Sequence, residues 1–231
     1  MRKRFDTTAV AALGMLSAWA SFSVLAHNVD KADQAFLASA TGIQIIPFIY
    51  LGAKHMVTGY DHLLFLVGVI FFLYRLKEVA LYVTLFAVGH SLTLLTGVLA
   101  RIEVDPYLID AIIGLSVVYK AFDNLNGFRT LFGWQPEPRI AVLVFGLFHG
   151  FGLATKLQEL QLSQEGLVPN MLAFNVGVEI GQFLALGAIL LIINYWRSTT
   201  SFLRHAYITN VALMAAGFAL TGEQLTGYFV G

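Results

Sequence analysis

Long apolar segments separated by short polar ones dominate the chain from residue 60 onwards. Each is close to the roughly 20 residues that a helix needs to cross a bilayer. A chain in hydrocarbon must satisfy its own backbone hydrogen bonds, so such segments predict membrane-spanning α-helices. We therefore expect an all-α, polytopic membrane helix bundle. Its six predicted crossings cover residues 60–75, 79–100, 107–123, 140–158, 169–195 and 206–229.

The amino-terminal segment has the features of a secretory signal. A basic stretch at residues 2–4 precedes an apolar run, and small residues permit cleavage after Ala26. We predict a signal peptide over residues 1–26, followed by a single membrane-embedded domain over residues 27–231. The apolar run is long for a signal core, so an uncleaved anchor is the alternative.

Residues 43–58 are also apolar but are interrupted by Pro47, Lys54 and His55. The segment is too short for a full crossing, and we interpret it as a re-entrant or interfacial helix. The loops then set the orientation, because lysine and arginine prefer the cytoplasmic side. Basic residues gather in alternate loops, which places the mature amino terminus outside the cytoplasmic (inner) membrane. These residues are Arg75, Lys77, Arg129, Arg139, Arg197 and Arg204.

Composition supports an integral membrane protein and narrows the chemistry. The 231 residues are 58% hydrophobic and 12% charged, with a formal net charge of zero. No basic block is present, so we expect membrane lipid and no nucleic acid as a partner. Cysteine is absent, which leaves imidazole, carboxylate and amide groups as metal ligands.

Three potential ligands stand at the start of the first predicted crossing, in the stretch His55-Met-Val-Thr-Gly-Tyr-Asp61-His62. On one continuous helix, His55 and His62 would be separated by about 10 Å of rise, too far to share an ion. A shared site therefore requires a break in the helix. Gly59 is the natural position, because glycine tolerates backbone angles that other residues avoid.

Further polar residues lie near the middle of later crossings. His90, His149 and Glu179 should fall within about one helical turn of the same depth. Asn175, Glu179 and Gln182 have the spacing of one helix face, so we expect Glu179 to face both histidines. The alternative is that single histidines merely hydrogen-bond between helices. The predicted metal ligands are His55, Asp61, His62, His90, His149 and Glu179, supported by hydrogen bonds from Ser91, Asn175 and Gln182.

Two other sets of residues have structural interpretations. The glycines at positions 146, 150 and 152 around His149 should let neighbouring helices approach closely. Lys120 and Asp123 have the spacing of an intrahelical ion pair. Asp110 lies near the end of a predicted crossing, where solvent would reach it.

These motifs resemble the HupE/UreJ family of membrane proteins over nearly the whole mature chain. The resemblance rests on His55, Gly59, Asp61 and His62, and on Phe148-His149-Gly150. It also includes Gly89-His90-Ser91 and the stretch from Phe174 to Glu179. Met56 replaces a proline that often follows the first histidine. The resemblance implies a nickel or cobalt permease.

The leading hypothesis is transport of a divalent transition metal, nickel or cobalt first and zinc as an alternative. His55, Asp61 and His62 would capture the ion on the outer side, and His90, His149 and Glu179 would form a mid-membrane station. A second hypothesis is an intramembrane zinc hydrolase of a lipid amide or ester, with Asp61 or Glu179 as general base and Ser91 assisting. A metal sensor or assembly factor is a third. A homo-oligomer is compatible with each.

Overall fold

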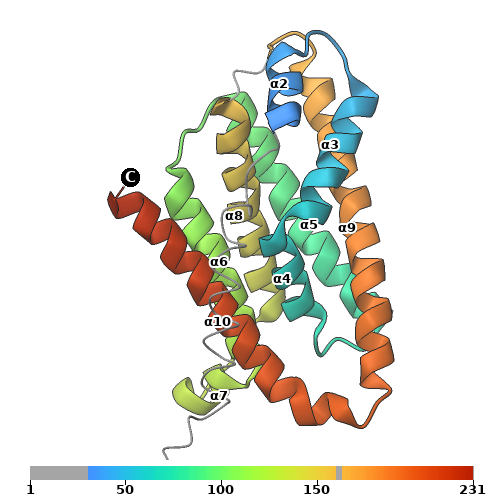
Figure 1. Cartoon of the computed structure of the whole chain (residues 1–231), viewed down its shortest axis with the longest axis vertical. Coiled ribbons are helices and arrows are strands. Elements are labelled where there is room, and N and C mark those ends of the chain that lie inside the picture. Colours follow the sequence, from blue (N-terminus) through green and yellow to red (C-terminus); the bar gives the residue numbers. More distant parts are fainter. Residues whose placement is uncertain (1–30, 160–162, 231) are drawn as a thin grey trace, which may run out of the picture.

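The computed structural model describes residues 31–159 and 163–230, and its regular elements there are all α-helices (Figure 1). The predicted all-α bundle is confirmed. The predicted signal peptide lies outside the described residues. The helices are α2 (Lys31–Ser39), α3 (Ile45–Thr58), α4 (Tyr60–Ile70), α5 (Leu76–Ala100), α6 (Pro106–Asn124), α7 (Gly127–Phe132), α8 (Pro138–Glu159), α9 (Leu167–Arg197) and α10 (Ser201–Val230).

Among the described residues, α5, α8 and α9 are long and apolar enough to cross a membrane. The first predicted crossing is wrong in its extent. It was expected to run to residue 75, but α4 has only 11 residues and ends at Ile70. α3 has 14 residues and leads directly into α4 through Gly59. The two together cover residues 45–70, a length that suffices for one discontinuous crossing.

Helix α9 runs beside this broken helix and holds both of its ends. At one end, Asn170 accepts from the Gln44 backbone N–H at 2.7 Å and donates to the Gly42 carbonyl at 2.9 Å. At the other end, the Arg197 guanidinium donates to the carbonyls of Ile70 and Phe71, where α4 terminates. The continuous helix α9 therefore holds α3 and α4 in position relative to each other (Figure 1).

Glycines bring α3 and α9 together along their length. A Cβ atom on Gly52 would collide with the Phe174 carbonyl, and one on Gly177 would collide with the Ile49 carbonyl. Small residues at helix contacts are typical of membrane bundles, where packing and polar contacts replace the hydrophobic effect between helices. The discontinuous helix is therefore fixed by close backbone contact as well as by its ends.

Glycines also allow close contact between α5 and α8. A Cβ on Gly146 would collide with the Phe86 carbonyl, and one on Gly150 would collide with the His90 carbonyl. The Thr93 hydroxyl also donates to the Leu147 carbonyl at 2.7 Å. The predicted close approach at residues 146 and 150 is confirmed, and it sets the positions of the histidines on both helices.

Helices α6 and α10 form the third close pair, where Gly114 lies against Thr221 and Gly217 against Val118. At the carboxyl end of α6, the Asn124 amide donates to the Asn210 side-chain oxygen at 2.9 Å and to the Gly68 carbonyl at 2.8 Å. α4, α6 and α10 are thereby joined by polar contacts inside the bundle.

The buried charges on α6 are paired with lysines. Lys120 donates to Asp123 at 2.6 Å, so the predicted intrahelical ion pair is confirmed. The expectation for Asp110 was wrong, because its side chain is 6% exposed and accepts from Lys156 at 2.7 Å. The reason is that Lys156 on the neighbouring α8 reaches it, a contact between helices that the spacing on one helix does not reveal.

We expect Gly146→Ala to destabilise the bundle, because the added methyl meets the α5 backbone, which cannot move aside as a side chain can. Overpacking of this kind costs about 1–3 kcal/mol. Thermal unfolding in detergent should show a lower midpoint. Gly187→Ala on α9 is the matched control, since nothing lies within 4 Å of its added Cβ. Equal midpoints for both variants would contradict the packing described here.

Candidate metal site

The break between α3 and α4 falls at Gly59, as the sequence predicted. The Gly59 N–H still donates to the His55 carbonyl at 3.0 Å, and its own carbonyl accepts from the Leu63 N–H at 3.1 Å. Its backbone angles, φ −72° and ψ 105°, are extended ones. The break is thus one extended residue between two helical segments whose neighbouring hydrogen bonds remain intact.

The need for glycine at this position is one of space. Any residue adopts a φ of −72°, so the predicted reason, unusual backbone angles, was wrong. A Cβ on Gly59 would instead lie 2.6 Å from Nδ1 of His62 and 3.1 Å from Oδ1 of Asp61. The missing side chain makes room for the two polar groups that begin α4.

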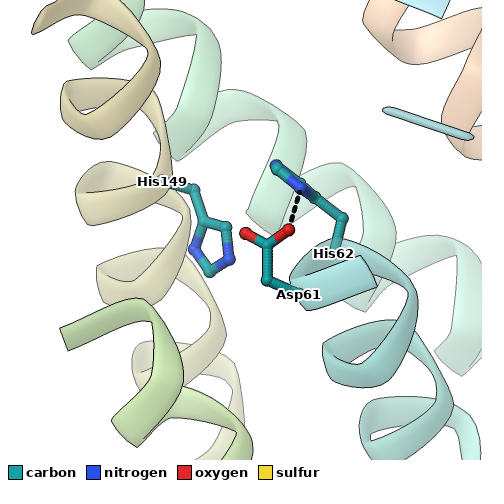
Figure 2. Close-up of side chains that lie close together, drawn as sticks. All are labelled: Asp61, His62 and His149. Atoms are coloured by element: carbon teal, nitrogen blue, oxygen red, sulfur yellow. Dashed lines mark hydrogen bonds and ion pairs between the residues drawn. The ribbon is translucent and has the colours of Figure 1, made fainter. Parts of the chain in front are cut away.

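Asp61, His62 and His149, hereafter the triad, come together inside the bundle (Figure 2). Their exposed fractions are 1%, 2% and 2%, respectively. Each offers one ligand atom, and these atoms lie within 4.8 Å of one another. Figure 2 shows the carboxylate, from α4, directed toward the space between the two imidazole rings. The arrangement could hold one metal ion.

Hydrogen bonds orient both imidazoles of the triad. Nδ1 of His149 lies 2.7 Å from the Phe145 carbonyl, one turn earlier on α8. A carbonyl only accepts, so Nδ1 carries the proton and Nε2 presents a lone pair. Nδ1 of His62 lies 3.1 Å from Oδ1 of Asp61, and it donates a hydrogen bond to that oxygen in the tautomer that leaves Nε2 unprotonated. Such contacts fix the tautomer and ring orientation of a metal-binding histidine.

Two more predicted ligands surround His62. The ring centroids of His55 and His62 are 5.1 Å apart, and those of His62 and His149 are 5.0 Å apart. The His90 ring is 6.3 Å from that of His62 and is fully buried. An outer capture group and a separate mid-membrane station were expected from the sequence, whereas the structure gathers the four histidines predicted as ligands into one cluster.

Glu179 does not face this cluster. Its side chain is exposed on α9, along the same strip as Val176 and Phe183. Asn175 and Gln182 turn inward and are buried, and Gln182 donates to the Val83 carbonyl at 3.5 Å. The predicted orientation of Glu179 was therefore wrong. Asn175, Glu179 and Gln182 spread over about 60° of the helix circumference, and the boundary between buried and exposed surface falls within that range.

Aromatic rings form an apolar layer against the triad. The rings of Phe86 and Phe65 lie 4.9 and 5.6 Å from that of His149, and the Phe145 ring lies 5.9 Å from that of Phe65. These contacts exclude water from one side of the site and strengthen electrostatic interactions there. Sequence reasoning missed them, because phenylalanines are frequent in apolar helices and carry no signal of a site. Ser91, the residue after His90, is half-buried.

A family model described as HupE / UreJ protein matches residues 31–231. The chain belongs to the HupE / UreJ family. Comparison with curated proteins and with solved structures gave no match. The HupE / UreJ family is associated with metal transport, and this agrees with a buried cluster of imidazole and carboxylate ligands among membrane-type helices.

We expect Gly59→Ala to weaken metal binding by this HupE / UreJ protein while the fold persists. The observed φ suits alanine, but the methyl group displaces the His62 ring and the Asp61 carboxylate. Disturbing groups that orient metal ligands typically costs about 10–100-fold in affinity. Calorimetric titration of the purified protein with Co²⁺ measures the change. Gly222→Ala, in open space on α10, should bind like the parent; an unaltered affinity in Gly59→Ala would contradict the geometry.

Proposed function

We propose that this protein carries a divalent transition-metal ion across the cytoplasmic membrane and that the triad is the central station of the path. The proposal rests on one observation: Asp61, His62 and His149 are buried and lie close together at a helix break inside the bundle. Ionisable groups are costly within a membrane and mark ion paths or catalytic centres. Family membership favours the path.

The donor set suits the proposed cargo. Imidazole nitrogen binds nickel, cobalt and zinc well, whereas copper(I) prefers the thiolate ligands that this chain lacks. Three protein ligands leave coordination positions for water or for a neighbouring histidine, so the ion can enter and leave by ligand exchange. Within this set we propose nickel or cobalt, on the basis of the family.

The helix break also suits a transport site. Discontinuous helices in transporters place helix ends at mid-membrane binding sites, where carbonyls or N–H groups help to hold the substrate. Here the carboxyl end of α3 favours a cation through its helix dipole. Asp61, in the first turn of α4, offsets the opposite polarity of that helix end. His55 stands in the last turn of α3 and extends the ligand set toward the proposed outer side.

We expect His149→Gln and Asp61→Asn to abolish uptake of radiolabelled Ni²⁺ or Co²⁺ into proteoliposomes. Each variant keeps the size of its side chain but removes a metal ligand or its charge. His205→Gln is the matched control, because His205 is exposed on α10 and its Nδ1 bonds to the Ser201 carbonyl one turn earlier on the same helix. It should transport like the parent.

Parent-like uptake in both triad variants would refute the proposal. Stoichiometric zinc retained through purification, together with hydrolysis of a lipid amide or ester, would instead support the hydrolase hypothesis.

Uptake should also fall as the pH is lowered from 8 to 5. Histidine must be neutral to bind a metal, so protons compete with the ion for imidazole ligands. Initial uptake rates measured from pH 5 to 8, with equal pH on both sides of the membrane, test this. A rate that rises toward acid pH would contradict capture by imidazole.

A further inference from the structure

His90 and Asn175 are buried polar side chains whose polar atoms are not hydrogen-bonded. His90 is 0% exposed and Asn175 is 6% exposed. Neither ring nitrogen of His90 and neither amide atom of Asn175 has a hydrogen-bond partner among the described residues. An unsatisfied buried polar group destabilises the folded state, so four such atoms need an explanation.

The bundle satisfies its other buried asparagines. Asn170 bonds to the backbone before α3, and Asn210 both accepts from Asn124 and donates to the Ala206 carbonyl at 2.9 Å. Among the described residues, single buried atoms also lack a partner elsewhere, as at Tyr119, but only His90 and Asn175 have two such atoms each. Buried polar atoms of this kind accommodate an ion or an ordered water.

The two side chains lie at the same level of the bundle. Gln182 on α9 bonds to the Val83 carbonyl on α5, and the two helices run in opposite directions (Figure 1). His90 is seven residues beyond Val83, and Asn175 is seven residues before Gln182. Both are thus about 10 Å from that contact along their helices.

A second contact places Asn175 at the level of the histidine cluster. The ring of Phe174, its neighbour on α9, lies 6.2 Å from the His55 ring. His90 belongs to the same level, because its ring is 6.3 Å from that of His62. His90 nevertheless lies outside the group of ligand atoms formed by the triad. The two side chains come from α5 and α9, whereas the triad comes from α4 and α8.

We infer that His90 and Asn175 form a second station for the divalent metal ion, adjacent to the triad; this inference rests on the proposed function. An imidazole nitrogen and an amide oxygen are both metal ligands, and water would complete the coordination. The station carries no carboxylate, so it binds the ion more weakly than the triad does. Adjacent sites of moderate affinity allow an ion to enter and still leave.

The test is a Co²⁺ titration of the purified protein in detergent, followed by calorimetry and by metal analysis. The parent should bind two ions, one tightly and one weakly. Asn175→Leu, which is close to isosteric, should lose the weakly bound ion, keep the tight one and reduce uptake at least about tenfold. His149→Gln should lose the tightly bound ion. A parent that binds one ion, with Asn175→Leu unchanged in ion number and uptake, would overturn the inference.

Thermal unfolding separates this role from a structural one. Asn175→Leu removes two unsatisfied atoms and should raise the unfolding midpoint, whereas Asn210→Leu breaks existing hydrogen bonds and should lower it. A stabilised Asn175→Leu variant that has lost the weak ion and slowed uptake supports the second station. Asn175→Leu with a lowered midpoint and an unchanged ion number would show a structural asparagine.

The outcomes also separate this inference from the proposed function. If the parent binds two ions but does not transport, the transport proposal fails and the second binding site stands. If it transports with a single bound ion, the second site fails and the transport proposal stands.

Discussion

The constraint on which the rest of the structure depends is the helix break at Gly59. A membrane bundle tolerates irregular backbone only where protein or a water-filled cavity satisfies it. Here the break is a single extended residue, and α9 holds both ends of the broken helix through Asn170 and Arg197. Because the break is short and supported, the ends of two half-helices can meet inside the bundle, and Asp61 and His62 enter at that point.

The close helix pairs follow from the same requirement. The imidazole and carboxylate side chains on α4, α5 and α8 converge only if these helices are held at fixed separations. Glycines provide this at positions where a Cβ would collide with the opposite backbone. The Gly150 contact with the His90 carbonyl is the clearest case, because it joins the residue next to His149 to another histidine of the cluster. The same glycine contacts thus pack the helices and position the histidines of the cluster.

The sequence predicted the elements of the fold and most residues of the cluster, because both depend on local pattern and depth. The break at Gly59 followed from the spacing of His55 and His62. Which side chains of a helix face the interior of the bundle was harder to predict from the sequence. Glu179 and Asn175 share a helix face by spacing, yet one is exposed and the other buried, since the boundary of a buried surface depends on which neighbours pack there. No pattern within one helix records those neighbours.

Charge pairing distinguishes Asp61 of the triad from the other buried aspartates. Three aspartates are buried among the described residues. Asp110 and Asp123 each contact a lysine ammonium within 2.7 Å, and such pairs are close to electrically neutral. Asp61 contacts an imidazole, which is neutral when it acts as a metal ligand. A divalent ion at the proposed station would therefore be offered a carboxylate together with imidazole lone pairs, whereas at the lysine pairs it would meet an ammonium group beside the carboxylate.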